Sequence, residues 1–184
     1  TTGSLAYPAP VAMTAAGPFR ALVAGDQGDV CAVPTTGVTL YCWGSNMGGM
    51  LGQDPATTPL VTSPTAISIP AEFVDFASVA LGWTHACATT TGGDLFCWGD
   101  GGLGQTGSST LSSSFSPVYV TSSANFSAFV ASAGDAFTCV AFSDWSTQCM
   151  GWNFYGQVGQ SNPNGTYSSL TTVVGLDSVP TTPQ

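Results

Sequence analysis

Three similar segments of the sequence decide the fold: Cys42-Trp-Gly-Ser-Asn-Met-Gly-Gly-Met-Leu-Gly52, Cys97-Trp-Gly-Asp-Gly-Gly-Leu-Gly-Gln-Thr-Gly107 and Cys149-Met-Gly-Trp-Asn-Phe-Tyr-Gly-Gln-Val-Gly159. Each opens on a cysteine, has a glycine two residues later, and ends on a glycine ten residues after the cysteine. The opening cysteines are 55 and then 52 residues apart. Self-similarity with a period of about 50 residues is typical of repeat proteins. The sequence therefore predicts three equivalent units in one repeat domain, residues 1–184.

Other features recur upstream of each segment. A stretch containing proline and β-forming residues comes first, at Pro10–Met13, Pro64–Ile67 and Pro117–Val120. A stretch that begins Val-Ala and ends on glycine follows, at Gly25, Gly82 and Gly134. Clusters of Gly, Pro, Ser and Thr separate these stretches, and no segment shows a sustained apolar period of 3.6 residues. We therefore expect an all-β protein with about four short strands per unit.

The six cysteines form three closely spaced pairs, Cys31/Cys42, Cys87/Cys97 and Cys139/Cys149. Each pair flanks a short turn-forming stretch, and two strands joined by such a turn place the flanking cysteines opposite each other. We therefore predict a disulfide within each pair, contributing roughly 2–3 kcal/mol of stability. Six buried free thiols are the alternative. The pairs lack the C-x-x-C spacing of structural zinc sites, and His85 is the only histidine.

Three disulfides would place the chain in an oxidising compartment. Two glycosylation sequons, at Asn125 and Asn164, fit a secreted or cell-surface protein. Serine and threonine together make up about a quarter of the residues, which suits an exposed glycoprotein surface. We interpret Thr1 as the start of a processed or trimmed chain, because no charged-then-apolar leader precedes the first repeat.

Composition and charge exclude several classes of protein. Hydrophobic residues make up 43%, charged residues only 6%, and the mean hydropathy is +0.26, which excludes a typical disordered segment. The single cation, Arg20, stands against ten acids, for a net charge of -9. Binding to nucleic acid or to an anionic membrane needs clustered Lys and Arg, so neither is expected. No apolar run reaches the roughly 18 residues of a membrane span, so we expect no membrane insertion.

The repeated segments resemble the regulator-of-chromosome-condensation repeat, a family of β-propellers. The resemblance covers about residues 8 to 160 and rests on the Gly…His-Ala-Cys-Ala stretch at Gly82–Ala88, the Cys-Trp-Gly triplets, and the Gly-Gln-x-Gly tails at Gly104–Gly107 and Gly156–Gly159. His85 has no counterpart in the other two units, and Met150 replaces the tryptophan of the third triplet. The resemblance implies propeller-type blades, which we place at residues 8–56, 57–109 and 110–161.

Three blades are too few to close a ring, since propellers of this type have about seven. Two apolar blade faces are then left uncovered. Residues Tyr167–Gly175 look like the opening strand of a fourth blade, within an orphan strand and Pro/Thr-rich tail at 162–184. We predict that this strand adds to the sheet of a neighbouring copy. The self-association residues would be Tyr167, Leu170, Val173 and Val174. The missing neighbour is the rest of a longer polypeptide, a ring of copies, or the next copy in a filament.

Sequence motifs for catalysis, cofactor binding or metal binding are weak. Gly99–Gly104 matches G-x-G-x-x-G, but no helix follows it, as a dinucleotide site would need. A Ser-His-Asp triad would have to use His85 with Asp94 or Asp100, and the repeat already explains His85 as a strand residue. The acids of Asp26–Asp29 and Asp100 lack the spacing of a calcium loop, and we interpret them as solvated turn residues. We expect no catalytic residue, no metal and no cofactor.

Two functional hypotheses follow. The first is an extracellular, non-enzymatic structural protein whose propeller-like repeats self-associate into a larger assembly, namely a fibre. The second is a segment of a secreted β-propeller recognition module that binds a protein or a glycan. The resemblance supports the second, because family members act as protein-binding platforms, including exchange factors for small GTPases and an inhibitor of β-lactamase.

Overall fold

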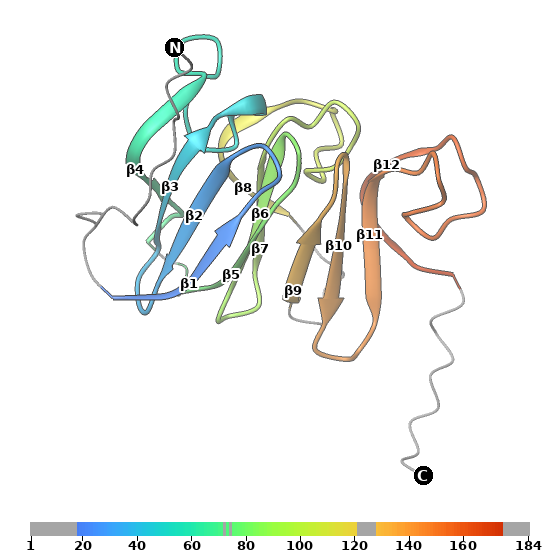
Figure 1. Cartoon of the computed structure of the whole chain (residues 1–184). Coiled ribbons are helices and arrows are strands. Elements are labelled where there is room, and N and C mark those ends of the chain that lie inside the picture. The colour runs from blue at the N-terminus through green and yellow to red at the C-terminus, as the bar shows by residue number, and fades with distance from the viewer. Residues whose placement is uncertain (1–17, 72, 74, 121–127, 175–184) are drawn as a thin grey trace, which may run out of the picture.

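The computed structural model describes residues 18–71, 73, 75–120 and 128–174. These ranges contain twelve β-strands, one 3₁₀ turn, η1 (Met47–Gly49), and no α-helix (Figure 1). None of the helical structure found there is long or apolar enough to cross a membrane.

The strands form three four-stranded antiparallel sheets. The first sheet contains β1 (Phe19–Ala24), β2 (Asp29–Pro34), β3 (Thr39–Ser45) and β4 (Leu60–Ser68). The second contains β5 (Phe76–Leu81), β6 (His85–Thr90), β7 (Leu95–Gly99) and β8 (Ser114–Val120). The third contains β9 (Ala128–Ala133), β10 (Phe137–Phe142), β11 (Thr147–Trp152) and β12 (Thr166–Thr172).

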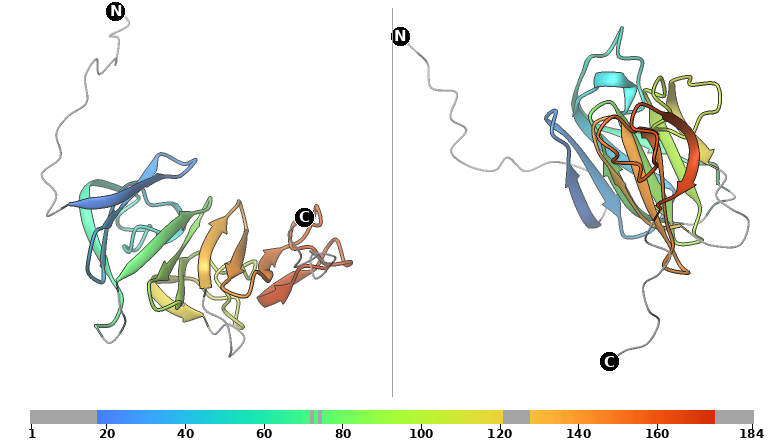
Figure 2. Two further views of the ribbon diagram at one scale, coloured as in Figure 1. Left: turned by 90° about the horizontal axis from the view of Figure 1, so that it is seen from below. Right: turned by 90° about the vertical axis from the view of Figure 1, so that its right-hand side faces the viewer.

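Within each sheet, every strand pairs with the next strand along the chain. Figure 2 shows the three sheets side by side in sequence order, with the first and third at the two ends of the row. The all-β architecture of three propeller-type blades, expected from the repeats, is confirmed.

The repeated glycine two residues after each opening cysteine is required by the backbone. Gly44, Gly99 and Gly151 have φ values of 105°, 97° and 110°, a region that strongly favours glycine. At each of them the register between the third and fourth strands shifts. A Cβ at Gly99 would lie only 2.6 Å from the carbonyl oxygen of Thr84 on the adjacent turn. The repeated glycine therefore marks a β-bulge that occurs in all three sheets.

Two hydrophobic cores lie between the sheets. The first joins the facing sides of the first and second sheets and includes Leu40, Phe76 and Trp98, all with essentially no exposed surface. The second joins the second and third sheets and includes Val140 and Phe142. The outer faces of the first and third sheets have no neighbouring sheet among the described residues.

The three predicted disulfides are present. Cys31–Cys42, Cys87–Cys97 and Cys139–Cys149 join directly opposed residues of a hairpin, with Cα–Cα distances of 4.1 Å. The first two bonds lie in the two inter-sheet cores, each on the side that faces the following sheet. The free-thiol alternative is wrong, since no described cysteine is free.

The prediction of an orphan C-terminal strand is wrong. β12 pairs with β11, with Tyr167 opposite Gly151 and Thr171 opposite Cys149, and so completes the third sheet. The proline-containing stretches close sheets rather than opening them: residues 64–67 lie in β4 and residues 117–120 in β8. The physical reason is proximity, because a strand that follows a loop pairs with the free edge of the strand just before it.

The sheets are accordingly offset from the predicted blade boundaries. They span residues 19–68, 76–120 and 128–172, whereas the blades expected from the sequence were at 8–56, 57–109 and 110–161. The stretch Pro10–Met13, expected to open the first blade, and the tail beyond residue 174 lie outside the described residues.

Candidate interaction surface

The first junction between sheets contains a buried hydrogen bond. Nε1 of Trp98, on β7, donates to the carbonyl oxygen of Met50 at 2.7 Å, and neither residue has exposed surface. A buried carbonyl without a partner destabilises a fold, so this hydrogen bond stabilises the packing of the first sheet's loop against the second sheet.

The second junction has the same construction with a different donor. Gln105 occupies the repeat position of Met50, and its carbonyl oxygen accepts a hydrogen bond of 2.8 Å from Oγ1 of Thr138 on β10. Thr138 lies directly opposite Met150, which stands at the repeat position of Trp98. The departure from the Cys-Trp-Gly pattern at Met150 is therefore explained, because the donor has moved to the adjacent strand.

His85 belongs to this second junction. Its Nε2 lies 2.8 Å from Thr138 Oγ1. The Thr138 hydroxyl donates its hydrogen bond to the Gln105 carbonyl, so it accepts a hydrogen bond from His85. This assigns the Nε2–H tautomer to the His85 ring. Nδ1 of His85 is buried without a partner. Burial lowers the pKa of His85 to about 4, against a smaller raising effect of Asp100, so the ring is neutral near pH 7.

The geometry gives no support to a triad around His85. The described partner of the ring is Thr138, and Asp94 hydrogen-bonds Thr90 at the other end of the sheet. No sequence signal pointed to Thr138, because it lies 53 residues from His85 and they meet only when the sheets pack.

We expect His85 to make stability depend on pH. Its pKa is 6.5 when unperturbed and about 4 in the folded protein. Between pH 4 and pH 6.5, His85 is therefore protonated in the unfolded chain and neutral in the folded chain. The stabilisation is complete above pH 6.5 and is lost as the pH falls toward 4, by up to about 3 kcal/mol. Guanidinium unfolding of the protein and of His85→Gln, at several pH values in this range, checks this.

The raised pKa of Asp29 has the opposite effect on the pH dependence of stability, but it is present in both proteins and cancels in their difference. The His85→Gln variant therefore isolates the contribution of His85. We expect the difference in unfolding free energy between the two proteins to shrink as the pH is lowered. A difference that stays constant over this range would contradict the assignment of His85 as a buried neutral ring.

Asparagines brace the loops that follow β3 and β11. Asn46 accepts from the Leu51 amide at 2.9 Å and donates to the carbonyls of Gln53 and Thr58 at 3.0 and 2.8 Å. Asn153, at the same repeat position, makes the same three bonds, to Val158, Gln160 and Asn162. Both asparagines are fully buried.

These loops lie together at one end of the three sheets, which we call the loop end: residues 25–28, 46–59, 82–84, 100–113, 134–136 and 153–165. It forms the upper edge in Figure 1. The loop end carries exposed large apolar side chains, namely Met47, Trp83, Leu103, Leu111, Phe154 and Tyr155. It also carries exposed carboxylates, Asp26, Asp54 and Asp135.

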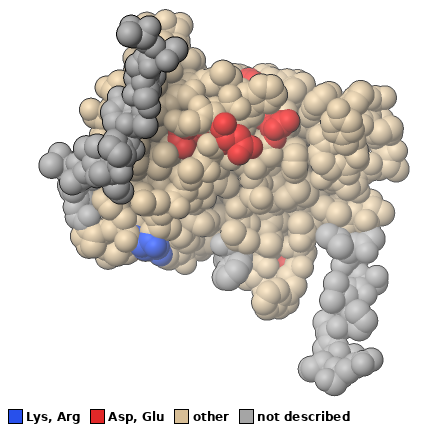
Figure 3. Space-filling view, viewed as in Figure 1, with Lys and Arg blue, Asp and Glu red and all other residues tan. Residues whose placement is uncertain are grey.

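The single cation lies away from the loop end, whereas acids occur at both ends, with Asp94 and Asp144 in hairpin turns opposite the loop end. The only cation, Arg20, donates to the carbonyls of Pro34 and Thr35, at the end of β2 away from the loop end. Figure 3 shows acidic side chains in a row across the upper part of the molecule, with the basic group at its lower edge. The loop end thus presents exposed apolar and acidic side chains, and buried asparagines brace two of its loops.

Comparison with known proteins agrees with the repeated geometry. The Regulator of chromosome condensation (RCC1) repeat matches residues 39–89 and 92–141, and a second version of it matches residues 76–105. The chain belongs to the RCC1 repeat family. The matched ranges cover more than half of the chain and include both inter-sheet junctions.

Several known proteins are similar to most of this chain. The Ultraviolet-B receptor UVR8 of Arabidopsis thaliana is 30% identical over 132 residues, which are 72% of this chain and 29% of the receptor. Yeast RCC1 (Prp20), in its structure bound to Kap60, has a TM-score of 0.72 at 18% identity, covering 84% of this chain and 37% of that one. Human WBSCR16 has a TM-score of 0.73 at 17% identity, covering 88% of this chain and 39% of that one. The chain spans less than two fifths of the length of these relatives.

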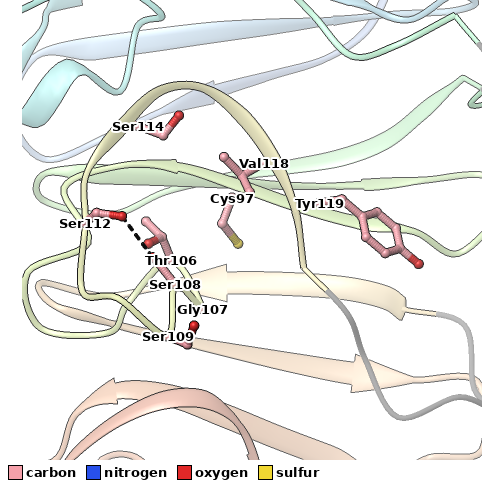
Figure 4. Close-up of a pocket in the computed structure, with 9 residues that line it drawn as sticks. All are labelled: Cys97, Thr106, Gly107, Ser108, Ser109, Ser112, Ser114, Val118 and Tyr119. Atoms are coloured by element: carbon pink, nitrogen blue, oxygen red, sulfur yellow. Dashed lines mark hydrogen bonds between the residues drawn. The ribbon is translucent and has the colours of Figure 1, made fainter.

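One pocket, of about 280 Å³, lies beside the loop of the second RCC1-type sheet (Figure 4). Its lining is Cys97, Thr106, Gly107, Ser108, Ser109, Ser112, Ser114, Val118 and Tyr119. Ser108 and Ser112 hydrogen-bond each other at 3.1 Å, and the Tyr119 ring points away from the serines in Figure 4. The lining offers hydroxyl groups but no carboxylate, amine or imidazole, so it holds no acid–base pair for catalysis.

The structure places Asp29 differently from the sequence analysis. We expected a solvated turn residue, but Asp29 has no exposed surface, and both its carboxylate oxygens lack hydrogen-bond partners. It occupies the repeat position of His85 and lies over Gly25, where a Cβ would overlap its carboxylate. Burial raises the pKa of this carboxyl group. In the described part of the chain, no three His, Cys, Asp or Glu residues gather as a metal site would require.

The remaining predicted site residues are distributed as follows. Asn164 is exposed in the loop 153–165, whereas Asn125 lies outside the described residues. Leu170 packs on the second core, and the Val173 amide donates to the Thr147 carbonyl at 3.1 Å. Val174 is 71% exposed. Tyr167, Leu170, Val173 and Val174 thus belong to their own third sheet or its margin, and their role in self-association stays a prediction.

Proposed function

We propose that the chain is part of an extracellular β-propeller recognition module that binds a protein partner through its loop end. The observation that carries this proposal is the loop end itself, where braced loops hold apolar and acidic side chains in the solvent. The yeast relative supports a protein as the ligand, because one of its structures is bound to Kap60 and another was studied together with its binding to Gsp1p and histones.

The extracellular placement rests on covalent chemistry. Each sheet contains a disulfide, and such bonds persist in oxidising compartments. The sequon at Asn164 lies in an exposed loop, where a glycosyltransferase can reach it.

We expect Asn164 to carry a glycan when the chain passes through a eukaryotic secretory pathway. The native mass should fall on treatment with an N-glycosidase, and Asn164→Gln should remove the larger part of that change. Intact-mass spectrometry measures both. An unmodified Asn164 peptide in secreted material would contradict this part of the proposal.

Self-association into a ring or fibre is the second candidate function, and the two uncovered faces favour it. Trp43 stands at the repeat position of Trp98, and its indole N–H has no acceptor among the described residues. Gln157 stands at the repeat position of Gln105, and its carbonyl has no donor in the same ranges. A contact between the first sheet of one copy and the third sheet of the next would pair them, and such head-to-tail contacts build rings or filaments.

Light scattering of the chain during size-exclusion chromatography distinguishes the two candidates. A recognition module should elute as a monomer of 18.6 kDa plus glycan at every concentration. Self-assembly should give larger species that Trp43→Phe weakens, since this variant removes the N–H but keeps an aromatic ring. The matched control is Trp145→Phe, because Trp145 is 91% exposed on a hairpin turn. Large species lost in Trp43→Phe alone would overturn the recognition proposal in favour of assembly.

A further inference from the structure

Three aromatic side chains form a contiguous strip where β11 runs into the loop end of the third sheet: Trp152 is partly buried, and Phe154 and Tyr155 are exposed. The rings of Trp152 and Phe154 stack at 5.1 Å, and the Tyr155 ring meets Phe154 edge-on at 4.8 Å and Trp152 at 6.4 Å. Phe154 is 46% exposed and Tyr155 is 82% exposed. Clustered aromatic side chains exposed on a protein surface mark interaction sites.

The repeat does not require aromatic residues here. The same three positions hold Ser45, Met47 and Gly48 in the first sheet. In the second sheet they hold Asp100, Gly102 and Leu103. The strip is therefore particular to the third sheet and has no general role in building a blade.

The exposure of Phe154 and Tyr155 does not result from the lack of a described sheet beyond the third. Met47, equivalent to Phe154, is 45% exposed, although the second sheet covers the first. Leu103, equivalent to Tyr155, is 38% exposed, although the third sheet covers the second. Side chains at these positions therefore stay accessible when another blade follows.

The strip is held in place before any ligand arrives. Asn153 braces the loop with its three hydrogen bonds, and Oε1 of Gln157 accepts from the Tyr155 amide at 2.7 Å. A surface that is already ordered loses little conformational entropy on binding.

An exposed carboxylate and a further tryptophan adjoin the strip. The Trp152 amide donates to the Ala136 carbonyl at 2.8 Å, and the Trp83 amide donates to the Gly134 carbonyl at 3.3 Å. The turn that presents exposed Asp135 is thus flanked by Trp152 on one side and by Trp83, 47% exposed, on the other.

We propose that this surface, comprising Trp83, Asp135, Trp152, Phe154 and Tyr155, binds an arginine-bearing segment of the protein partner. A guanidinium is planar, stacks on aromatic rings and pairs with a carboxylate through its fixed donors. The chain has a net charge of -9 and one cation, so its field attracts a basic segment and repels an acidic one. This inference rests on the proposed protein-recognition function and names the chemistry of the partner.

The test uses a fluorescein-labelled peptide of alternating glycine and arginine, with lysine and citrulline versions, and measures fluorescence anisotropy with the full 184-residue chain. We expect the arginine peptide to bind about fivefold more tightly than the lysine peptide, and the neutral citrulline peptide not to bind. Asp135→Asn and Tyr155→Ala should each weaken arginine-peptide binding about five- to tenfold.

The repeat supplies matched controls. Asp26→Asn makes the same change at the equivalent turn of the first sheet, which has no aromatic strip beside it. Leu103→Ala truncates the residue equivalent to Tyr155. Both should leave binding within about twofold of the parent chain.

Equal losses in Asp26→Asn and Asp135→Asn would overturn the inference, because binding would then reflect net charge alone. Equal affinity for the arginine and lysine peptides, or undiminished binding in Tyr155→Ala, would also overturn it. If these results accompany a glycosylated monomer in the earlier experiments, the inference fails while the proposed function stands, because the partner must then bind elsewhere on the loop end.

Discussion

Trp98→Ala is expected to lower the free energy of unfolding by about 4 kcal/mol. The indole has no exposed surface and fills the core between the first two sheets, so truncation leaves a cavity there. It also removes the donor to the Met50 carbonyl and leaves that oxygen buried without a partner. Guanidinium unfolding followed by far-ultraviolet circular dichroism measures the loss.

Two further variants separate the contributions at Trp98. Trp98→Phe keeps most of the ring and removes the hydrogen bond, so it should cost about 1–2 kcal/mol. Trp145→Ala removes a tryptophan that is 91% exposed and should change stability by less than about 0.5 kcal/mol. A loss in Trp98→Ala no larger than that in Trp145→Ala would show that the first two sheets do not pack as described.

Replacing both Cys87 and Cys97 with alanine is expected to cost roughly 3 kcal/mol, because the bond constrains a loop of about ten residues in the unfolded chain. Both cysteines are fully buried in the core between the second and third sheets. Some packing is therefore lost as well. Equilibrium unfolding of the double variant against the parent chain gives the change.

The disulfide of the third sheet is the matched control. Cys139 and Cys149 have the same sequence separation of 10 residues, but neither belongs to the core between the second and third sheets, and Cys139 is only partly buried. Replacing this pair with alanine should remove the same chain constraint with less loss of packing. A larger cost for the Cys139/Cys149 pair than for the Cys87/Cys97 pair would contradict the placement of the second bond in the core.

Much of the fold could be predicted without the structure because its signals are local. Opposed cysteines in a hairpin are only ten or eleven residues apart, so turn residues and spacing were enough to pair Cys31 with Cys42 and its two counterparts. The repeated glycine reports a backbone φ that favours glycine strongly wherever it recurs. Repetition at a steady period then identified three blades of one kind.

Strand assignment and the surface depended on longer-range contacts. A proline-containing strand can close one sheet or open the next with the same local sequence, and only the pairing of β12 with β11 decides between them. The contact of His85 with Thr138 likewise arises only when the second and third sheets pack. The aromatic strip adjoins Asp135 because Trp152 on β11 bonds to the turn between β9 and β10. Hairpins and turns are specified by residues close together in the chain, whereas burial and surface chemistry are set by which faces meet in space.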